Sequence, residues 1–161
     1  MNGKERREFV REHKTCIFGY GRQKDGPSMS VVYYAMDGDD IVLSTMRARA
    51  KAKAIMRNPK ISLCVLNEEW PLTYLLVYGD AKIEEDPNAD MLMKVSEIMS
   101  GGPIPESKRA QLIEMAKKED RVVVRMKPYA TFESPPRHVY KPSDIDTLTH
   151  DLGQNLAWDA D

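Results

Sequence analysis

Residues 37–66 decide the fold, and they read DGDDIVLSTMRARAKAKAIMRNPKISLCVL. The Asp37-Gly38 pair suits the positive φ angles of a two-residue hairpin turn, and the apolar run 40–45 after it is typical of the returning strand. A basic, alanine-rich segment follows until Pro59, and a second strand-like run occupies 60–66. The stretch therefore predicts a strand, a helix and another strand in direct succession.

The basic segment of this stretch alternates cations with alanines. In a strand, this alternation would place the cations on one face, but alanine is the best helix former and a weak strand former. We therefore expect a helix from about Met46 to Arg57. Three small or apolar residues are expected to pack on the sheet, namely Ala48, Ala52 and Ile55. Arg49, Lys53 and Arg57 are expected to cluster on another edge.

The positive charge of the chain is local. Residues 47–60 hold six cations and no acid, whereas the 161-residue chain has a net charge of −1, so the remainder carries −7. Three interpretations compete: a solvated helix face, a nucleic-acid site and a site for an anionic cofactor. Because aromatic residues do not alternate with the cations and the chain is not basic overall, we expect no nucleic-acid partner.

The cofactor interpretation depends on the junction between the strand and the helix. Ser44 and Thr45 end the strand and precede the helix, so either could serve as its N-cap. The N–H groups of the first turn and the helix dipole both favour an anion at such a point. Hydroxyls, peptide N–H groups and an arginine that can grip two oxygens together suit a phosphate group.

The rest of the chain predicts a mainly β protein. Strand patterns occupy 15–21, 28–36, 73–85 and 121–134, and helical spacing occupies 5–13, 87–100 and 107–118. With the two strands of the opening stretch, we expect six strands joined by short links, which favours an antiparallel sheet closed into a barrel. Residues 1–136 form this domain, and we expect the acidic tail, 137–161, to pack on it or on a partner subunit.

The composition of the chain limits its possible cellular location and its possible binding partners. The chain is 42% hydrophobic and 30% charged, as in an ordinary globular domain, and no apolar run approaches a membrane span. The N-terminus is too polar for a signal peptide. Cys16 and Cys64 lie in strand-like runs that suit buried thiols, and no His or Cys spacing suits zinc. We expect a cytoplasmic protein with no membrane partner and no metal.

A family resemblance adds to this interpretation. Together with YLLVYGDAKIEEDP at 74–87, the opening stretch resembles the pyridoxamine 5'-phosphate oxidase-like, FMN-binding split-barrel proteins. It is most similar to their coenzyme F420 (deazaflavin)-dependent reductase branch. The resemblance runs over 15–87 and again over 121–136, and it depends on the order of the pieces: an Asp-Gly hairpin, Ser-Thr, Arg-x-Lys, Asn-Pro and Gly-x-Ala.

The resemblance implies a six-stranded antiparallel split β-barrel that acts as a homodimer, with cofactor sites at the interface. By position, the residues implied to bind the cofactor phosphate and its charge are Ser44, Thr45, Arg49, Lys51 and Lys53. The backbone of Ser30, Val31 and Val32 is implied to lie along the flavin-type ring. The branch often has an asparagine where this chain has Ala54, which removes one polar contact.

The implied function is an F420-dependent oxidoreductase that transfers hydride to a small organic acceptor. The alternative is an FMN-dependent oxidoreductase or a non-catalytic flavin-binding module. Three cations beyond the Arg-x-Lys pair favour F420, which carries an oligoglutamate tail: Arg47, Lys53 and Arg57. No catalytic residue can be assigned. Tyr33, Tyr34, Tyr74 and Tyr78 either line the ring pocket or pack the barrel, and Trp70 either walls the substrate site or caps the barrel.

Overall fold

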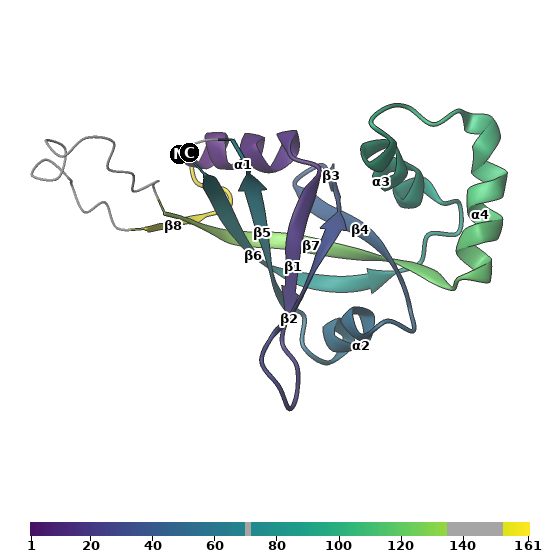
Figure 1. Cartoon of the computed structure of the whole chain (residues 1–161), viewed down its shortest axis with the longest axis horizontal. Helices are drawn as coiled ribbons and strands as arrows, with labels where there is room; N and C mark the ends of the chain where they lie inside the picture. Colours follow the sequence, from purple (N-terminus) through teal and green to yellow (C-terminus); the bar gives the residue numbers. More distant parts are fainter. Residues whose placement is uncertain (70–71, 135–152) are drawn as a thin grey trace, which may run out of the picture.

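The computed structural model describes residues 1–69, 72–134 and 153–161. An antiparallel sheet curls into a half-barrel, and helices flank it (Figure 1). The strands are β1 (Thr15–Tyr20), β2 (Ser28–Tyr33), β3 (Ala35–Asp37), β4 (Asp40–Met46), β5 (Lys60–Asn67), β6 (Thr73–Glu84), β7 (Arg121–Glu133) and β8 (Gln154–Ala157). The helices are α1 (Gly3–Glu12), α2 (Ala50–Arg57), α3 (Asp90–Ser100), the 3₁₀ turn η1 (Glu106–Lys108) and α4 (Arg109–Lys118). The expected mainly β, antiparallel fold is confirmed, and Trp70 lies outside the described residues.

The sheet curls because one segment of the chain, residues 28–37, supplies both of its edge strands, β2 and β3. The strand order is β2-β1-β5-β6-β7-β4-β3, so the two edge strands are neighbours in sequence. We expected a single strand over 28–36, but the structure breaks it at Tyr34. The Tyr34 side chain is 1% exposed, and its hydroxyl donates to the Val10 carbonyl at 2.6 Å. This bond and a second one, from the Tyr34 N–H to the Lys14 carbonyl at 3.2 Å, attach the break between β2 and β3 to the end of α1.

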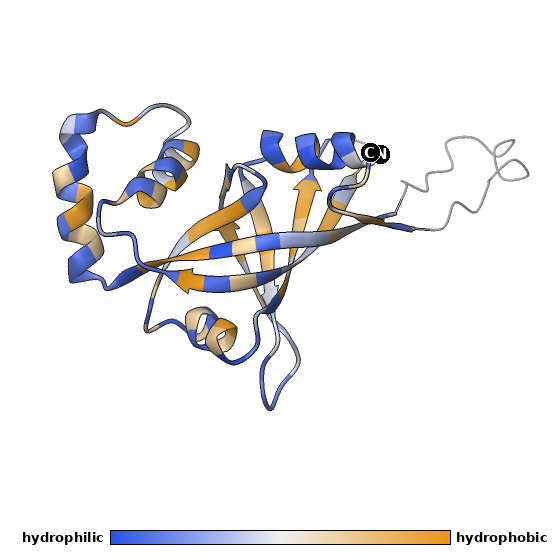
Figure 2. Cartoon of the chain, turned by 180° about the vertical axis from the view of Figure 1, so that it is seen from behind, coloured by the Kyte–Doolittle hydropathy of each residue, from blue (hydrophilic) through white to orange (hydrophobic). Residues whose placement is uncertain are grey.

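The main core fills the inner face of the half-barrel. Alternate residues of the strands supply it, among them Phe18, Leu63 and Val77, which are all 0% exposed. Helix α1 adds Val10 at one end of the barrel, and α2 lies at the opposite end (Figure 1). Figure 2 shows hydrophobic residues running along the strands of this sheet. Burial of this apolar surface is the main stabilising contribution.

A second, smaller core lies on the other face of β4. Val42 packs there with Val123 of β7 and Val95 of α3. Helix α4 extends beyond this contact and has no fully buried residue. Residues 41 and 43 of β4 face the barrel, whereas residue 42 faces α3. One face of this strand therefore packs in the main core and the other in the smaller core.

A β-bulge bends the longest strand pair. The register of β6 with β7 shifts between Tyr78 and Gly79, which leaves Tyr129 as the extra residue beside Pro128. Proline lacks a backbone N–H to donate to the ladder, which suits its place at a bulge. A Cβ atom on Gly79 would lie 2.6 Å from the Cε atom of Met126, so the close approach of the two strands requires glycine.

The two ends of the chain meet (Figure 1). Strand β8 pairs with the end of β7, and the buried Arg6 guanidinium donates to the carbonyls of Thr131 and Gln154. Trp158, which follows β8, is 7% exposed and joins the main core. Residues 135–152 lie outside the described residues, so the proposed boundary at 136 stays a prediction.

Candidate functional site

Helix α2 begins later than the sequence suggested. It starts at Ala50 rather than near Met46, because β4 continues to Met46 through its pairing with Arg121 of β7. The N-cap is Arg49, so the prediction that Ser44 or Thr45 caps the helix is wrong. Residues 47–49 form the connecting turn. Ala48 lies there, exposed, and Ala54 joins Ala52 and Ile55 on the buried face instead.

The two hydroxyls of β4 diverge. Consecutive residues of a strand point to opposite faces of the sheet. Thr45 therefore shares the barrel face with Leu43 and is 7% exposed. Ser44 lies on the face of the smaller core, where its hydroxyl accepts from Arg121 at 3.5 Å. The structure does not bring Ser44 and Thr45 to one point, and only Thr45 lies on the barrel side.

Lys51 reaches from α2 to the edge strand β2. Its Nζ atom donates to Ser30 Oγ at 2.9 Å and lies 5.3 Å from the centre of the Phe18 ring. Burial, followed by the nearby Arg49 charge, holds the pKa of Lys51 below its usual value of 10.5. A half-buried ammonium group is costly unless an anion accompanies it, so this position favours an anionic ligand.

Two of the six cations in the basic segment have structural roles. Arg47 forms ion pairs with Glu85 at 2.5 Å and with Asp120 at 3.2 Å, and Lys60 pairs with Asp80 at 2.8 Å. The other four are Arg49, Lys51, Lys53 and Arg57, and none of them enters an ion pair within the residues that the structure describes. Their charge therefore remains uncompensated around α2.

The start of α2 adds donors to these charges. No side chain of the described residues caps it, and its first turn contains no acid. The first N–H groups of a helix have no partner within the helix, and the helix dipole makes this end positive. The eight-residue helix thus offers peptide N–H groups beside Arg49 and Lys51, two of the residues implied to bind phosphate.

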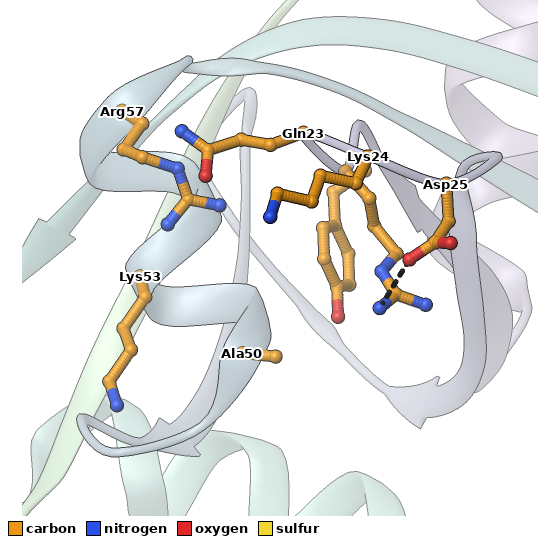
Figure 3. A pocket seen from close by; sticks show the side chains of 8 residues that line it. Gln23, Lys24, Asp25, Ala50, Lys53 and Arg57 are labelled. Atoms are coloured by element: carbon orange, nitrogen blue, oxygen red, sulfur yellow. Dashed lines mark ion pairs between the residues drawn. The ribbon is translucent and has the colours of Figure 1, made fainter.

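A pocket of about 310 Å³ lies between α2 and the loop that joins β1 to β2 (Figure 3). Its lining consists of Tyr20, Arg22, Gln23, Lys24, Asp25, Ala50, Lys53 and Arg57. We expected a role for Lys53, and the structure places it here with Arg57. The loop cations Arg22 and Lys24 were missed, because no pattern in the sequence indicates that this loop faces α2.

Strand β2 borders the site with a free edge. It pairs only with β1 in the described sheet, so its other edge leaves peptide groups available for hydrogen bonds. Ser30 and Val32 face the barrel beside Phe18 and Cys16, whereas Val31 is 73% exposed on the outer face. The structure therefore brings Ser30 next to Lys51, and it places the implied ring-binding backbone at an open edge.

Burial in the core accounts for Tyr34 and Cys16. Burial raises the pKa of Tyr34 well above its usual value and raises that of Cys16 to about 12, so neither side chain is poised to exchange a proton at neutral pH. Tyr33 is 41% exposed on the outer face. Within residues 1–69, 72–134 and 153–161, no three His, Cys, Asp or Glu side chains gather as metal ligands would.

The half-barrel, its open edge strand and the basic helix beside it define a split-barrel protein. The chain belongs to the pyridoxamine 5'-phosphate oxidase family, whose model matches residues 3–134. No curated protein sequence matches it significantly. No helix in the described part of the chain is long and apolar enough to cross a membrane.

Solved structures share this fold at low sequence identity. The conserved hypothetical protein Rv2991 from Mycobacterium tuberculosis is 23% identical, with a TM-score of 0.72 over 89% of this chain and 94% of that one. An F420 reductase is 24% identical, with a TM-score of 0.62 over 77% and 93%. HutZ, a heme storage protein from Vibrio cholerae, is 15% identical, with a TM-score of 0.55 over 78% and 88%. At these identities the likeness extends to the fold alone.

Proposed function

We propose that this chain is a cytoplasmic, F420-dependent oxidoreductase that transfers hydride between the bound deazaflavin and a small organic acceptor. One observation carries the proposal: the half-buried ammonium of Lys51 has no carboxylate partner among the described residues, and it lies beside Ser30 near the uncapped start of α2. Such a site suits the phosphate of a cofactor.

Each group of the chain has a defined task in this proposal. Lys51 and Arg49 neutralise the phosphate, and the first peptide N–H groups of α2 donate to it. The Ser30 hydroxyl holds the Lys51 ammonium at the barrel mouth. The free edge of β2, at Ser30 to Val32, offers peptide groups to the polar rim of a flat ring. The deazaflavin, when bound, supplies the hydride chemistry.

The distribution of charge favours the deazaflavin over FMN. Beyond the phosphate, FMN has no further anionic group, whereas F420 continues into an oligoglutamate tail. Lys53 and Arg57 lie in the pocket beside α2, where neither has an ion pair among the described residues, and they suit that tail. Arg47, which the sequence also suggested for the tail, forms ion pairs with Glu85 and Asp120 and is not available to it. The fold similarity to an F420 reductase agrees with this choice.

FMN remains the alternative because it would use the same phosphate groups. The family of this chain is defined by pyridoxamine 5'-phosphate oxidase, and the resemblance described above is to FMN-binding proteins. On this alternative, the chain is an FMN-dependent oxidoreductase or a flavin-binding module without catalysis. Lys51 and Ser30 would have unchanged roles, and the cations of the pocket would have none.

We further propose that the chain acts as a homodimer. The outer face of β2 exposes Met29, Val31 and Tyr33 at 68%, 73% and 41%. Tyr129 of β7 is 45% exposed. Large apolar side chains of this kind on an uncovered sheet suit a second subunit. A second copy packed here would also enclose the open edge of β2 and complete the cofactor site.

A side-by-side titration tests the proposal. Purified protein is titrated with F420 and with FMN while ring absorbance and fluorescence are followed. We expect saturable binding of F420 at micromolar or lower dissociation constants and weaker binding of FMN. The loaded protein is then screened for reduction of organic acceptors. Binding of neither cofactor would overturn the proposal, tighter binding of FMN would favour the alternative, and binding without any turnover would indicate a module without catalysis.

A further inference from the structure

One arginine fixes the turn that leads into α2. Residues 47–49 form this turn, which carries Arg49 and presents the first N–H groups of the helix. Inside the turn, the Arg49 N–H donates to the Met46 carbonyl at 3.0 Å, and this bond only closes it. Among the described residues, every hydrogen bond or ion pair from the turn to parts of the chain outside β4 and α2 comes from Arg47. Arg47 therefore sets where the turn lies.

Arg47 makes three such contacts, to two residues. Its N–H donates to the Asp120 carbonyl at 2.9 Å, and its Nε atom donates to the Asp120 carboxylate at 3.2 Å. Its Nη2 atom donates to the Glu85 carboxylate at 2.5 Å. Glu85 follows β6 and Asp120 precedes β7, and these two strands are neighbours in the sheet. The Arg47 clamp, which consists of Arg47, Glu85 and Asp120, thus ties the turn to the ends of both strands.

The backbone of Asp120 gives the clamp a fixed anchor. Its φ angle is 47°, in the left-handed region, which aspartate adopts more readily than most other non-glycine residues. Such a conformation persists where surrounding contacts hold it in place. Arg47 contacts both the carbonyl and the carboxylate of Asp120, so the arginine and this conformation support each other.

The position of the turn decides where Lys51 lies. The far end of α2 is attached to β6, because the Ala81 N–H donates at 2.9 Å to the carbonyl of Pro59, two residues after the helix ends. The helix has only eight residues, so a shift of its start carries Lys51 along. The 2.9 Å contact of Lys51 with Ser30 therefore depends on the clamp at the other end.

We propose that Arg47 is a positioning residue for the cofactor phosphate, which it serves by holding Glu85 and Asp120 and without touching the ligand. The clamp keeps Arg49 and the first N–H groups of α2 beside Lys51. This inference rests on the proposed function for the identity of the ligand only. Because ion pairs between exposed side chains contribute little to stability, the clamp is expected to affect the site more than the stability of the fold.

The first test needs no cofactor. The Lys51 ammonium is titrated by NMR in the wild type, in Arg47→Met and in Asp120→Gly, since glycine suits the positive φ angle. The Arg49 charge is one of the causes that lower the pKa of Lys51, after burial. If the clamp holds Arg49 beside Lys51, both variants should raise that pKa toward 10.5. The two variants change the net charge in opposite directions, so a direct effect of the removed charge would shift the pKa in opposite directions.

Arg109→Met is the matched control. Arg109 also joins two carboxylates, Asp90 of α3 and Glu106 of η1, but it does not contact the turn. Its substitution should leave the pKa of Lys51 unchanged. Opposite shifts in Arg47→Met and Asp120→Gly, no shift in either, or the same shift in Arg109→Met would each overturn the proposal. This result stands whether or not F420 or FMN binds, so it is independent of the proposed function.

The second test asks whether the clamp acts on the phosphate. F420 and a phosphate-free deazaflavin are titrated into wild-type protein, Arg47→Met and Arg47→Lys. Arg47→Met should weaken F420 about fivefold and leave the phosphate-free ring unchanged. Arg47→Lys should recover part of the loss, because its ammonium can pair with one of the two carboxylates. An equal loss for both ligands, or full affinity for F420 in Arg47→Met, would contradict this role.

Discussion

At the scale of single residues, the proposed site depends on one lysine, which the fold holds in a half-buried position where a positive charge is costly. Lys51 is half-buried, next to Ser30 and above Phe18, and burial lowers its pKa. Charged residues at active and binding sites often have shifted pKa values of this kind, and a bound ligand then supplies the missing counter-charge. An anion bound beside Lys51 would raise its pKa again, which links cofactor affinity to pH.

This linkage predicts the pH dependence of cofactor binding. In the proposed site the charged form of Lys51 binds the phosphate, and its pKa in the folded protein lies below 10.5. Affinity for F420 should therefore fall as the pH rises through that lowered pKa, before an ordinary lysine would deprotonate. Lys51→Arg should keep its affinity over the same range, because a guanidinium group stays charged. Isothermal titration at several pH values measures this. Flat affinity up to pH 10.5 in the wild type would contradict the role of Lys51.

The sequence indicated some of these residues and not others. The pairing of Ser30 with Lys51 joins two positions that the family resemblance had marked, and 21 residues separate them. Ser44 and Thr45 looked equivalent in sequence, yet the alternation of β4 sends them to opposite faces. Arg22 and Lys24 appeared as ordinary turn residues, since only the folded sheet brings their loop against α2.

At the scale of elements, the errors in the sequence interpretation have local physical causes. The helix propensity of the alanines predicts a helix that begins near Met46. In the structure, β4 is still paired with β7 at Met46, so the helix begins only at Ala50. The strand pattern over 28–36 has no visible interruption, and the break lies at Tyr34, whose buried hydroxyl makes a tertiary hydrogen bond to the Val10 carbonyl. All six predicted strands exist and followed from local patterns. The sheet has eight strands, because the 28–36 segment is divided into β2 and β3 and because β8 was not predicted. This division, β8 and the boundaries required the three-dimensional fold.

The bulge of β7 gives a stability prediction. Gly79→Ala would place a Cβ atom 2.6 Å from Met126 and 2.7 Å from the Lys127 carbonyl oxygen. We expect a loss of about 1 to 3 kcal/mol in the free energy of unfolding, measured by urea denaturation. Gly102→Ala is the matched control, because no atom lies within 4 Å of its added Cβ. Equal stability of the two variants would show that the strands can separate without cost.

A network around Arg125 ties four strands together and predicts acid sensitivity. Its guanidinium, 18% exposed, pairs with Asp37 of β3, Asp40 of β4 and Glu84 of β6. Lys94 and then Arg125 hold the pKa of Asp37 below 3.8, and Lys82 and then Arg125 hold that of Glu84 below 4.5. The stability that these carboxylates contribute is complete above pH 4.5 and is lost as the pH falls through the lowered pKa values.

Arg125→Met should therefore cost about 1 to 2 kcal/mol at neutral pH and flatten the acid side of the stability profile. Urea denaturation at pH values between 7 and about 3 measures both effects. Lys127→Met, which removes a charge from an exposed position two residues along β7, serves as the control. An acid profile that is unchanged in Arg125→Met would contradict the network.

At the scale of the whole molecule, the half-barrel is closed at its two ends and open on its outer face. Helices α1 and α2 cover the ends, whereas none of the described helices covers the exposed outer face of β2 around Val31 (Figure 1). This arrangement accounts for the proposed dimer, because a second copy would cover both the apolar outer face and the free edge of β2. The cofactor site is then a product of assembly as well as of folding.

This view predicts that assembly and cofactor binding are linked. Val31→Glu places a charge on the 73% exposed Val31 position and should leave the subunit folded but shift it to monomer in sedimentation equilibrium. Affinity for F420 should fall in parallel. Met56→Glu makes the same kind of change at a 60% exposed position on α2 and should leave the dimer intact. A monomeric wild-type protein, or a dimer that survives Val31→Glu, would contradict this placement of the interface.

The most direct test of the central claim combines removal of the ligand phosphate with removal of Lys51. F420 and a phosphate-free deazaflavin are titrated into wild-type protein and into Lys51→Met. If Lys51 holds the phosphate, the substitution should weaken F420 about tenfold or more and leave the affinity for the phosphate-free ring unchanged. An equal loss for both ligands, or no loss for either, would contradict the assignment of this lysine to the cofactor phosphate.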